Sequence, residues 1–117
     1  IGYELGKILS KETIFSERVN GSFKLRRDFK IKKGDKVLIV EDVITTGKSS
    51  MECSELAILN NANIIGYACI IDRSNGKSEI KGKIVSQVKL NIPTYSKDNL
   101  PKELLSIEAV KPGSRNL

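Results

Sequence analysis

Residues 37–49 read VLIVEDVITTGKS. The apolar run at 37–40 predicts a buried strand, because an unbroken run of this kind has no wet face. Two adjacent carboxylates and a hydroxyl-rich loop with one glycine follow, and a helical pattern begins directly afterwards. This order is typical of a site at the carboxyl end of a parallel strand, where the next helix holds a phosphate at its N-terminus. The stretch therefore predicts a phosphorylated sugar as ligand.

Length and composition limit the possible classes of protein. A chain of 117 residues allows one domain with one modest core. Aromatic residues make up 5% and tryptophan is absent, which disfavours stacking on exposed bases and therefore nucleic acid as a main partner. No apolar stretch is long enough to cross a bilayer, and the first residues do not resemble a secretion signal. A reducing cytoplasm is the default location.

The ionisable residues narrow the chemistry further. Lysine and arginine number 20 against 14 acids, and the net charge of +6 attracts anions. A solvated basic surface is the commoner explanation of such a charge, but Arg18, Arg26 and Arg27 cluster in one segment, which somewhat strengthens the case for an anion site. Histidine is absent, which excludes histidine-based triads and histidine acid–base catalysis. Cys69 lies in an apolar strand pattern and is expected to be a buried reduced thiol.

Periodicity predicts an α/β architecture. We expect helices at 2–10 and 50–60, the first with Leu5, Ile8 and Leu9 on one face and the second capped by Ser49 or Ser50. Strands are expected at 12–16, 37–41, 64–71 and 84–90, a hairpin or mobile loop at 17–33, a turn at 33–35, a short helix at 101–107 and an irregular tail at 111–115. The middle elements form one βαβ unit, so the loops after its two strands meet at one rim.

The phosphate prediction rests on the backbone of residues 45–49. Their N–H groups, their hydroxyls and the helix dipole can wrap one terminal phosphate, while Glu41 and Asp42 accept hydrogen bonds from two ribose hydroxyls. A nucleotide P-loop is disfavoured, because that motif requires glycine where this chain has Asp42. The simpler alternative is an ordinary strand-to-helix turn, although an acidic pair ending an apolar strand is costly without a partner.

Residues 37–49 are similar to the ribose-phosphate signature of the type I phosphoribosyltransferases. Three flanking segments resemble the members of that family that act on orotate: Phe15-Ser16-Glu17-Arg18 with the basic loop after it, Ile71-Asp72-Arg73-Ser74, and AVKPGSR at 109–115. The similarity covers essentially the whole chain. It implies a three-layer α/β fold with a mostly parallel sheet, present as a single phosphoribosyltransferase domain at 1–117.

The resemblance also implies an activity. Orotate would displace pyrophosphate from phosphoribosyl pyrophosphate (PRPP) in the presence of Mg²⁺, giving orotidine 5'-monophosphate in pyrimidine (UMP) synthesis. PRPP would contact Glu41, Asp42, Val43, Ile44, Thr45, Thr46, Gly47, Lys48 and Ser49, and orotate would contact Thr45 and Arg73. The mobile catalytic loop would contribute Arg18, Lys24, Arg26 or Arg27. No residue is expected to bind the metal directly, although Glu41 and Asp42 could reach it through water.

The chain also departs from the family. Glu17-Arg18 stands where many relatives carry arginine-lysine, and the histidine that usually follows is missing. The resemblance begins well inside the expected fold and corresponds to roughly the C-terminal half of the enzyme. We therefore expect a domain that is truncated on its N-terminal side, with weak turnover on its own. The complete family member is expected to be a homodimer whose loop closes over the neighbouring subunit.

Several alternatives remain open. A transferase for a purine base would share the same sugar-phosphate loop, and a PRPP-sensing regulatory protein could contact RNA through the basic surface. Arg73 could be a surface arginine that pairs with Asp72, and the charged hairpin could be merely solvated. The base pocket and the salt dependence of any RNA binding would separate these possibilities.

Overall fold

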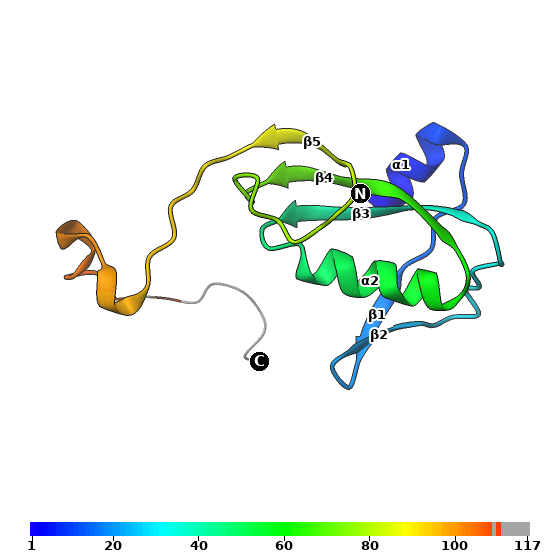
Figure 1. The fold of residues 1–117 in the computed structure, drawn as a ribbon, viewed down its shortest axis with the longest axis horizontal. Coiled ribbons are helices and arrows are strands. Elements are labelled where there is room, and N and C mark those ends of the chain that lie inside the picture. Colours follow the sequence, from blue (N-terminus) through cyan, green and yellow to red (C-terminus); the bar gives the residue numbers. More distant parts are fainter. Residues whose placement is uncertain (109, 111–117) are drawn as a thin grey trace.

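The computed structural model describes residues 1–108 and residue 110 (Figure 1). The tail expected at 111–115 and most of the similarity at 109–115 lie outside the described residues. The helices and strands in chain order are α1 (Gly2–Leu9), β1 (Ser16–Val19), β2 (Ser22–Leu25), β3 (Lys36–Ile44), α2 (Lys48–Leu59), β4 (Asn63–Asp72), β5 (Ile84–Lys89), and the 3₁₀ turns η1 (Lys97–Asn99) and η2 (Lys102–Leu104).

The central sheet contains three parallel strands in the order β3-β4-β5. In one row of its register, Glu41 pairs with Cys69 and Cys69 pairs with Ser86. The strands run in the same direction, so the loops that follow them gather at one edge of the sheet (Figure 1). The predicted βαβ unit is confirmed, and it places the 45–49 loop beside the loop that follows β4.

Strand β3 is longer than the sequence pattern predicted. It continues past residue 41 to Ile44, whose register partner is Asp72. Val43 and Ile44 are themselves apolar, and Ile44 retains only 1% of its accessible surface. Burial of these two side chains therefore extends the strand through the acidic pair, which belongs to the strand and not to the loop.

Helix α2 begins differently from the prediction. Gly47 is its N-cap, with φ at 84°, and the Thr46 hydroxyl accepts the N–H of Lys48, the first residue of the helix, at 3.3 Å. Ser50 is buried inside the first turn. The predicted cap at Ser49 or Ser50 was therefore wrong, because the left-handed conformation of Gly47 turns the chain into the helix two residues earlier.

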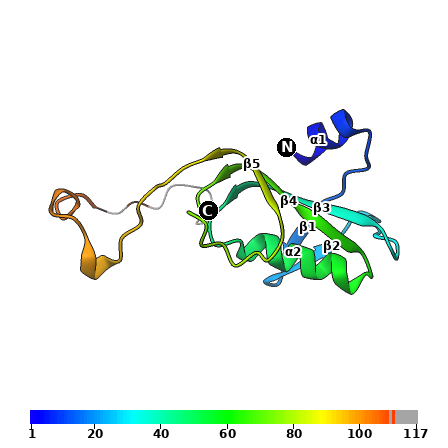
Figure 2. The same cartoon turned by 45° about the horizontal axis from the view of Figure 1, so that its top comes forward.

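The helices lie on opposite sides of the sheet (Figure 2). This arrangement gives the three layers that were expected. Helix α1 does not bury the predicted face, since Ile8 is 77% exposed and Leu9 is 51% exposed. Instead Gly6 packs against Thr13, whose hydroxyl donates a 3.1 Å hydrogen bond to the Gly2 carbonyl.

The hydrophobic core lies between helix α2 and the face of the sheet that this helix covers. Its buried members are Ile39, Ile44, Tyr67, Cys69 and Ile80. Cys69 is a free thiol and is buried, as the sequence predicted. Ile80 comes from the loop between β4 and β5, so this loop belongs to the core as well as to the rim.

The segment before β3 folds as a hairpin on α2. The expected strand at 12–16 was wrong, because pairing begins only at Ser16 and joins β1 antiparallel to β2. The hairpin predicted within 17–33 is confirmed, with the Asn20-Gly21 tip as its turn. Strand β2 packs against α2, and the Ser16 hydroxyl lies 3.4 Å from the Cys53 thiol at the base of the hairpin.

After β5 the chain runs away from the sheet (Figure 1). The helix expected at 101–107 is reduced to the single 3₁₀ turn η2, with a second turn, η1, before it. Within the described residues no helix is both long and apolar enough to span a membrane.

Candidate functional site

The loop at 45–49 leaves its amides available for a ligand. Within residues 1–108, the N–H groups of Thr45, Thr46, Gly47 and Ser49 donate to no protein group, whereas the Lys48 N–H donates to the Thr46 hydroxyl at 3.3 Å. The loop also opens the twelve-residue helix α2, whose dipole adds positive potential at this end. Free amides and a helix N-terminus together form an anion site.

Gly47 has no room for a side chain. A Cβ atom here would lie 2.6 Å from the Ser78 hydroxyl oxygen and 2.7 Å from Cγ1 of Ile80. The residue also has a positive φ that favours glycine. The glycine is therefore required twice, once by backbone conformation and once by the close approach of the 78–80 segment.

This 78–80 segment was missed by the sequence analysis. The Glu79 N–H donates to the Thr46 carbonyl at 3.0 Å, and the Ser78 hydroxyl donates to the same carbonyl at 3.4 Å. The contacts join residues more than thirty positions apart, and no local pattern in the sequence marks them. Only the parallel register of β3 and β4 brings the two loops together.

The acidic pair occupies two different environments. Successive residues of a strand point to opposite faces, so Glu41 and Asp42 do not point the same way. Glu41 is half-buried, while Asp42 is exposed and accepts a 2.7 Å hydrogen bond from the Val43 N–H. Burial raises the pKa of Glu41 above its ordinary value, Asp42 raises it further, and the Ser50 hydroxyl opposes both effects.

Arg73 lies directly beside the phosphate loop. Its N–H donates to the Ile44 carbonyl at 2.8 Å, one residue before the loop begins. Its Nε is buried and has no hydrogen-bond partner within the described residues. The alternative in which Arg73 pairs with Asp72 is not observed, because the Asp72 carboxylate instead accepts the Ser74 N–H at 2.8 Å. The guanidinium therefore has hydrogen-bonding capacity left for a ligand.

Asp72 organises the turn that carries this arginine. The hydroxyl and N–H of Ser74 lower the pKa of the Asp72 carboxyl, and Lys89 lowers it as well. A hollow of about 370 Å³ adjoins this turn, lined by Asp72, Asn75, Gly76, Lys89, Leu90 and Asn91. None of its lining residues belongs to the phosphate loop.

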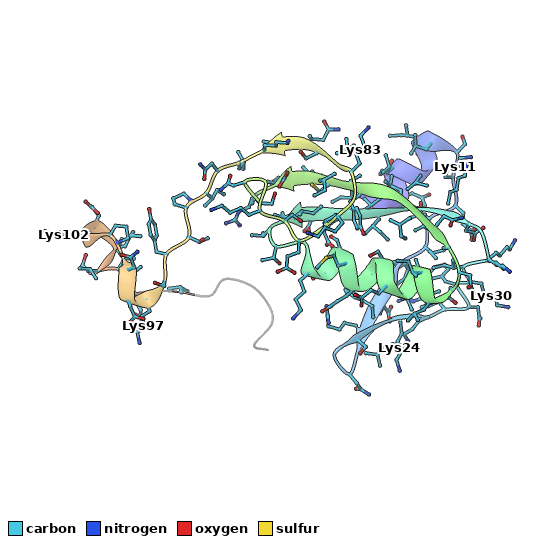
Figure 3. The ribbon with its side chains drawn as sticks, viewed as in Figure 1. Lys11, Lys24, Lys30, Lys83, Lys97 and Lys102 are labelled. Atoms are coloured by element: carbon cyan, nitrogen blue, oxygen red, sulfur yellow. The ribbon has the colours of Figure 1, made fainter. Side chains whose placement is uncertain are left out.

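The four loop cations lie on the β1–β2 hairpin and just beyond it. Arg18 forms an ion pair with Glu52 of α2 and lies over the Phe23 ring, 4.4 Å from the ring centre. Both Arg26 and Arg27 pair with Glu17, at 3.0 and 3.6 Å. Lys24 points into solvent (Figure 3). The structure thus groups the three arginines in ion pairs away from the phosphate loop.

The hairpin tip faces α2 along its length from Glu52 onward. A hollow of about 310 Å³ separates them, lined by Gly21, Ser22, Phe23, Glu52, Glu55, Leu56 and Leu59. The phosphate loop is at the N-terminal end of the same helix. Arg18 is paired about one helical turn after this loop, whereas Arg26 and Arg27 are paired within the hairpin segment itself.

Magnesium fits the site only in a limited way. Among the described residues, no group of three or more His, Cys, Asp or Glu side chains could hold a metal ion. Mg²⁺ commonly takes one or two protein carboxylates and completes its shell with water and substrate phosphates. Asp42 suits that arrangement, because it precedes the anion site and is accessible, whereas Glu41 points to the other face of the strand.

Comparison with known proteins agrees with this geometry. Residues 5–100 match the family model described as the phosphoribosyl transferase domain. The matched region includes the strand, the phosphate loop, α2, Arg73 and the hairpin.

Individual relatives are similar over almost the whole chain. It is 44% identical to an orotate phosphoribosyltransferase of Parvibaculum lavamentivorans and 50% identical to one of Methylorubrum populi, each over 99% of this chain. The corresponding enzyme of Novosphingobium aromaticivorans is 47% identical over 98% of it. The chain spans about 60% of the length of these relatives, in line with the partial resemblance expected from the sequence. It belongs to the family of phosphoribosyl transferase domains.

Proposed function

We propose that this chain supplies the ribose-phosphate site and the orotate carboxylate contact of an orotate phosphoribosyltransferase. The observation that carries the proposal is the juxtaposition of two groups. Within residues 1–108, the unpartnered N–H groups of Thr45, Thr46, Gly47 and Ser49 lie beside Arg73, whose Nε is buried without a partner. The first suits a sugar phosphate and the second suits a carboxylate, which a guanidinium binds through two parallel hydrogen bonds.

The proposed reaction replaces one bond at the ribose anomeric carbon. A ring N–H of orotate loses its proton and its nitrogen bonds to that carbon as the bond to pyrophosphate breaks; pyrophosphate departs with the bonding electrons and can take up the released proton. The amides at 45–49 hold the 5'-phosphate, one carboxylate of the Glu41–Asp42 pair accepts from the ribose hydroxyls, and Thr45 and Arg73 orient orotate. Positioning of the two substrates provides much of the rate enhancement in such an arrangement.

Charge on the leaving group is the second requirement. Mg²⁺, when bound through Asp42 and water, would neutralise part of the pyrophosphate charge. Arg18, Lys24, Arg26 and Arg27 are the candidates to contact pyrophosphate once the hairpin leaves α2. Cations placed where negative charge develops lower the barrier most when water is excluded.

Assembly and location are part of the same proposal. The full-length enzyme is proposed to act as a homodimer in the cytoplasm. Exposed apolar side chains support an assembly surface, including Ile8 at 77% and Leu59 at 81%. Light scattering coupled to size-exclusion chromatography would measure the mass of the assembly, and a purely monomeric full-length enzyme would contradict this part. The 117-residue chain is proposed to turn over slowly alone, since it spans about 60% of its relatives' length.

The arginine provides the decisive test. Arg73→Ala should weaken orotate binding at least tenfold in titration calorimetry performed with PRPP present, because a charge-assisted contact is lost. Arg73→Lys should recover only part of the affinity, since an ammonium cannot form the paired contact. PRPP binding alone should change little, and thermal stability should not fall, because the buried Nε has no bond to lose.

The control is Lys77→Ala, which removes an exposed cation from the same loop. It should leave orotate affinity unchanged. A panel with adenine, guanine and hypoxanthine addresses the purine alternative, because these bases lack a carboxylate. Stabilisation by a purine and PRPP, but not by orotate and PRPP, would overturn the assignment to orotate.

A further inference from the structure

Within this proposed function, we infer that Ser78 and Glu79 are positioning residues that aim the Gly47 N–H at the ribose phosphate. Neither residue was identified from the sequence, and neither is placed in direct contact with a substrate. The inference follows from how the peptide group between Thr46 and Gly47 is held.

The Thr46 carbonyl is held from one direction by two donors. The Glu79 N–H lies 3.0 Å from it and the Ser78 hydroxyl 3.4 Å. The Ser78 oxygen also accepts the Ile80 N–H at 3.2 Å. The 78–80 segment is therefore folded on itself, with its donors directed at a single acceptor.

Planarity of the peptide group converts this contact into an orientation. The Thr46 carbonyl and the Gly47 N–H belong to one rigid trans unit, so they point in opposite directions. Because the carbonyl is held toward Ser78 and Glu79, the Gly47 N–H must point away from them. This N–H is one of the loop amides that have no protein partner within residues 1–108.

The two hydrogen bonds from Ser78 and Glu79 to the Thr46 carbonyl form a clamp. The clamp is rigid because the 78–80 segment is anchored in the core. Ile80 is 8% exposed and packs in the same cluster as Ile39 and Ile44. Ser78 and Ile80 also occupy the space that a side chain at Gly47 would fill. The segment therefore cannot shift toward Gly47, and core packing prevents it from moving away without opening a cavity.

The same loop carries the arginine proposed to bind orotate. At its start the Arg73 N–H holds the Ile44 carbonyl, and at its end the Glu79 N–H holds the Thr46 carbonyl. Residues 73–79 thus grip the phosphate loop at two points, two residues apart. Arg73 and the contact with Thr46 therefore belong to one seven-residue segment that is fixed to the phosphate strand and loop at both of its ends.

The test removes the hydroxyl while leaving the core intact. Ser78→Ala should raise the dissociation constant for ribose 5-phosphate and the KM for PRPP by about threefold to tenfold, the range expected for one hydrogen bond. The KM for orotate should change less than twofold. In ¹⁵N-edited NMR, the Gly47 amide should lose most of its shift on addition of ribose 5-phosphate. Ser78→Thr keeps the hydroxyl and should restore the dissociation constant for ribose 5-phosphate and the KM for PRPP.

Matched controls separate the two levels of the proposal. Ser96→Ala removes an exposed serine that precedes η1 and whose side chain makes no cap hydrogen bond there, and it should change nothing. If the unsubstituted chain binds neither ribose 5-phosphate nor PRPP, the proposed function fails. If it binds both and Ser78→Ala binds equally well with an unchanged Gly47 shift, only the positioning role fails. Should Ser78→Ala lose its fold, the comparison of Ser78→Thr with Ser78→Cys isolates the hydroxyl.

Discussion

The phosphate loop and the β1–β2 hairpin both carry residues proposed to meet PRPP, yet they are held in contrasting ways. The loop is fixed by backbone hydrogen bonds from residues 73–79 and by the buried Ile44 and Ile80. The hairpin is attached to α2 through one exposed ion pair between Arg18 and Glu52, through the packing of β2, and through one partly buried contact between Ser16 and Cys53. Backbone contacts near a core resist change, whereas exposed ion pairs contribute little. The comparison indicates that the binding site is preorganised, whereas the β1–β2 hairpin can separate from α2.

The largest effect is expected from Gly47→Ala. The added methyl would clash with Ser78 and Ile80 and would force alanine into a left-handed conformation. We expect a loss of about 3 kcal/mol in the free energy of unfolding and no measurable binding of ribose 5-phosphate. Urea denaturation and calorimetry would measure the two quantities.

Gly34→Ala is the matched control for that substitution. Gly34 has a φ of 86°, and nothing lies within 4 Å of the position of its Cβ. It should lose only about 1 kcal/mol, from backbone strain alone. Equal losses at the two glycines would mean that the close contact with 78–80 does not constrain the phosphate loop.

A smaller effect, of opposite sign, is expected from Glu41→Gln. The folded pKa of Glu41 is raised, so its ionisation opposes folding, and this cost grows as the pH rises from 4.5 through the raised pKa. At pH 7 the variant should therefore melt at a higher temperature than the unsubstituted chain. Below pH 4.5 the difference should vanish, because Glu41 is protonated in both states. Binding of ribose 5-phosphate should weaken.

Asp72→Asn reverses this pH dependence and serves as its control. The folded pKa of Asp72 is lowered, so its charge stabilises the fold above pH 3.8 and this stability is lost on acidification through the lowered pKa. The variant should be less stable at pH 7. A thermal melt series that gave both variants the same sign would contradict the two environments described for these carboxylates.

The smallest change in stability is expected from Glu52→Gln, which acts on the hairpin. Its ion pair with Arg18 is exposed, so the free energy of unfolding should change by less than about 1 kcal/mol. Release of the hairpin should nevertheless speed tryptic cleavage near Lys24 about threefold, since local opening is governed by these weak contacts. Glu55→Gln, on the same helix without an ion pair, should cleave at the original rate.

The sequence predicted the sheet better than it predicted the connections. The strand around Ile39, the helix after the loop and the roles proposed for residues 41–49 all depend on local patterns of burial and charge. The end of β3 at Ile44 and the cap at Gly47 depend instead on tertiary contacts. Ladder pairing with β4 extends the strand, and the 78–80 segment fixes the turn.

The clamp could not be inferred from the sequence for the same reason. Ser78 and Glu79 follow a polar stretch that reads as an ordinary loop, and their partner Thr46 is far away along the chain. The position of Arg18 against α2 could not be predicted either, because its partner Glu52 lies on the outer surface of that helix. Patterns within one element predict that element, whereas contacts between loops require the register that joins them.

The two cysteines give the molecule an internal reporter of hairpin position. Cys53 lies beneath the Ser16 hydroxyl at the foot of β1, whereas Cys69 is buried and its thiol pKa is raised by that burial. A maleimide dye should consequently label Cys53 before Cys69, and at a higher rate when the β1–β2 hairpin separates from α2. Cys69 should remain unlabelled until the sheet unfolds. Labelling rates of Cys53 with and without PRPP would thus measure how readily the hairpin separates from α2, with no engineered probe.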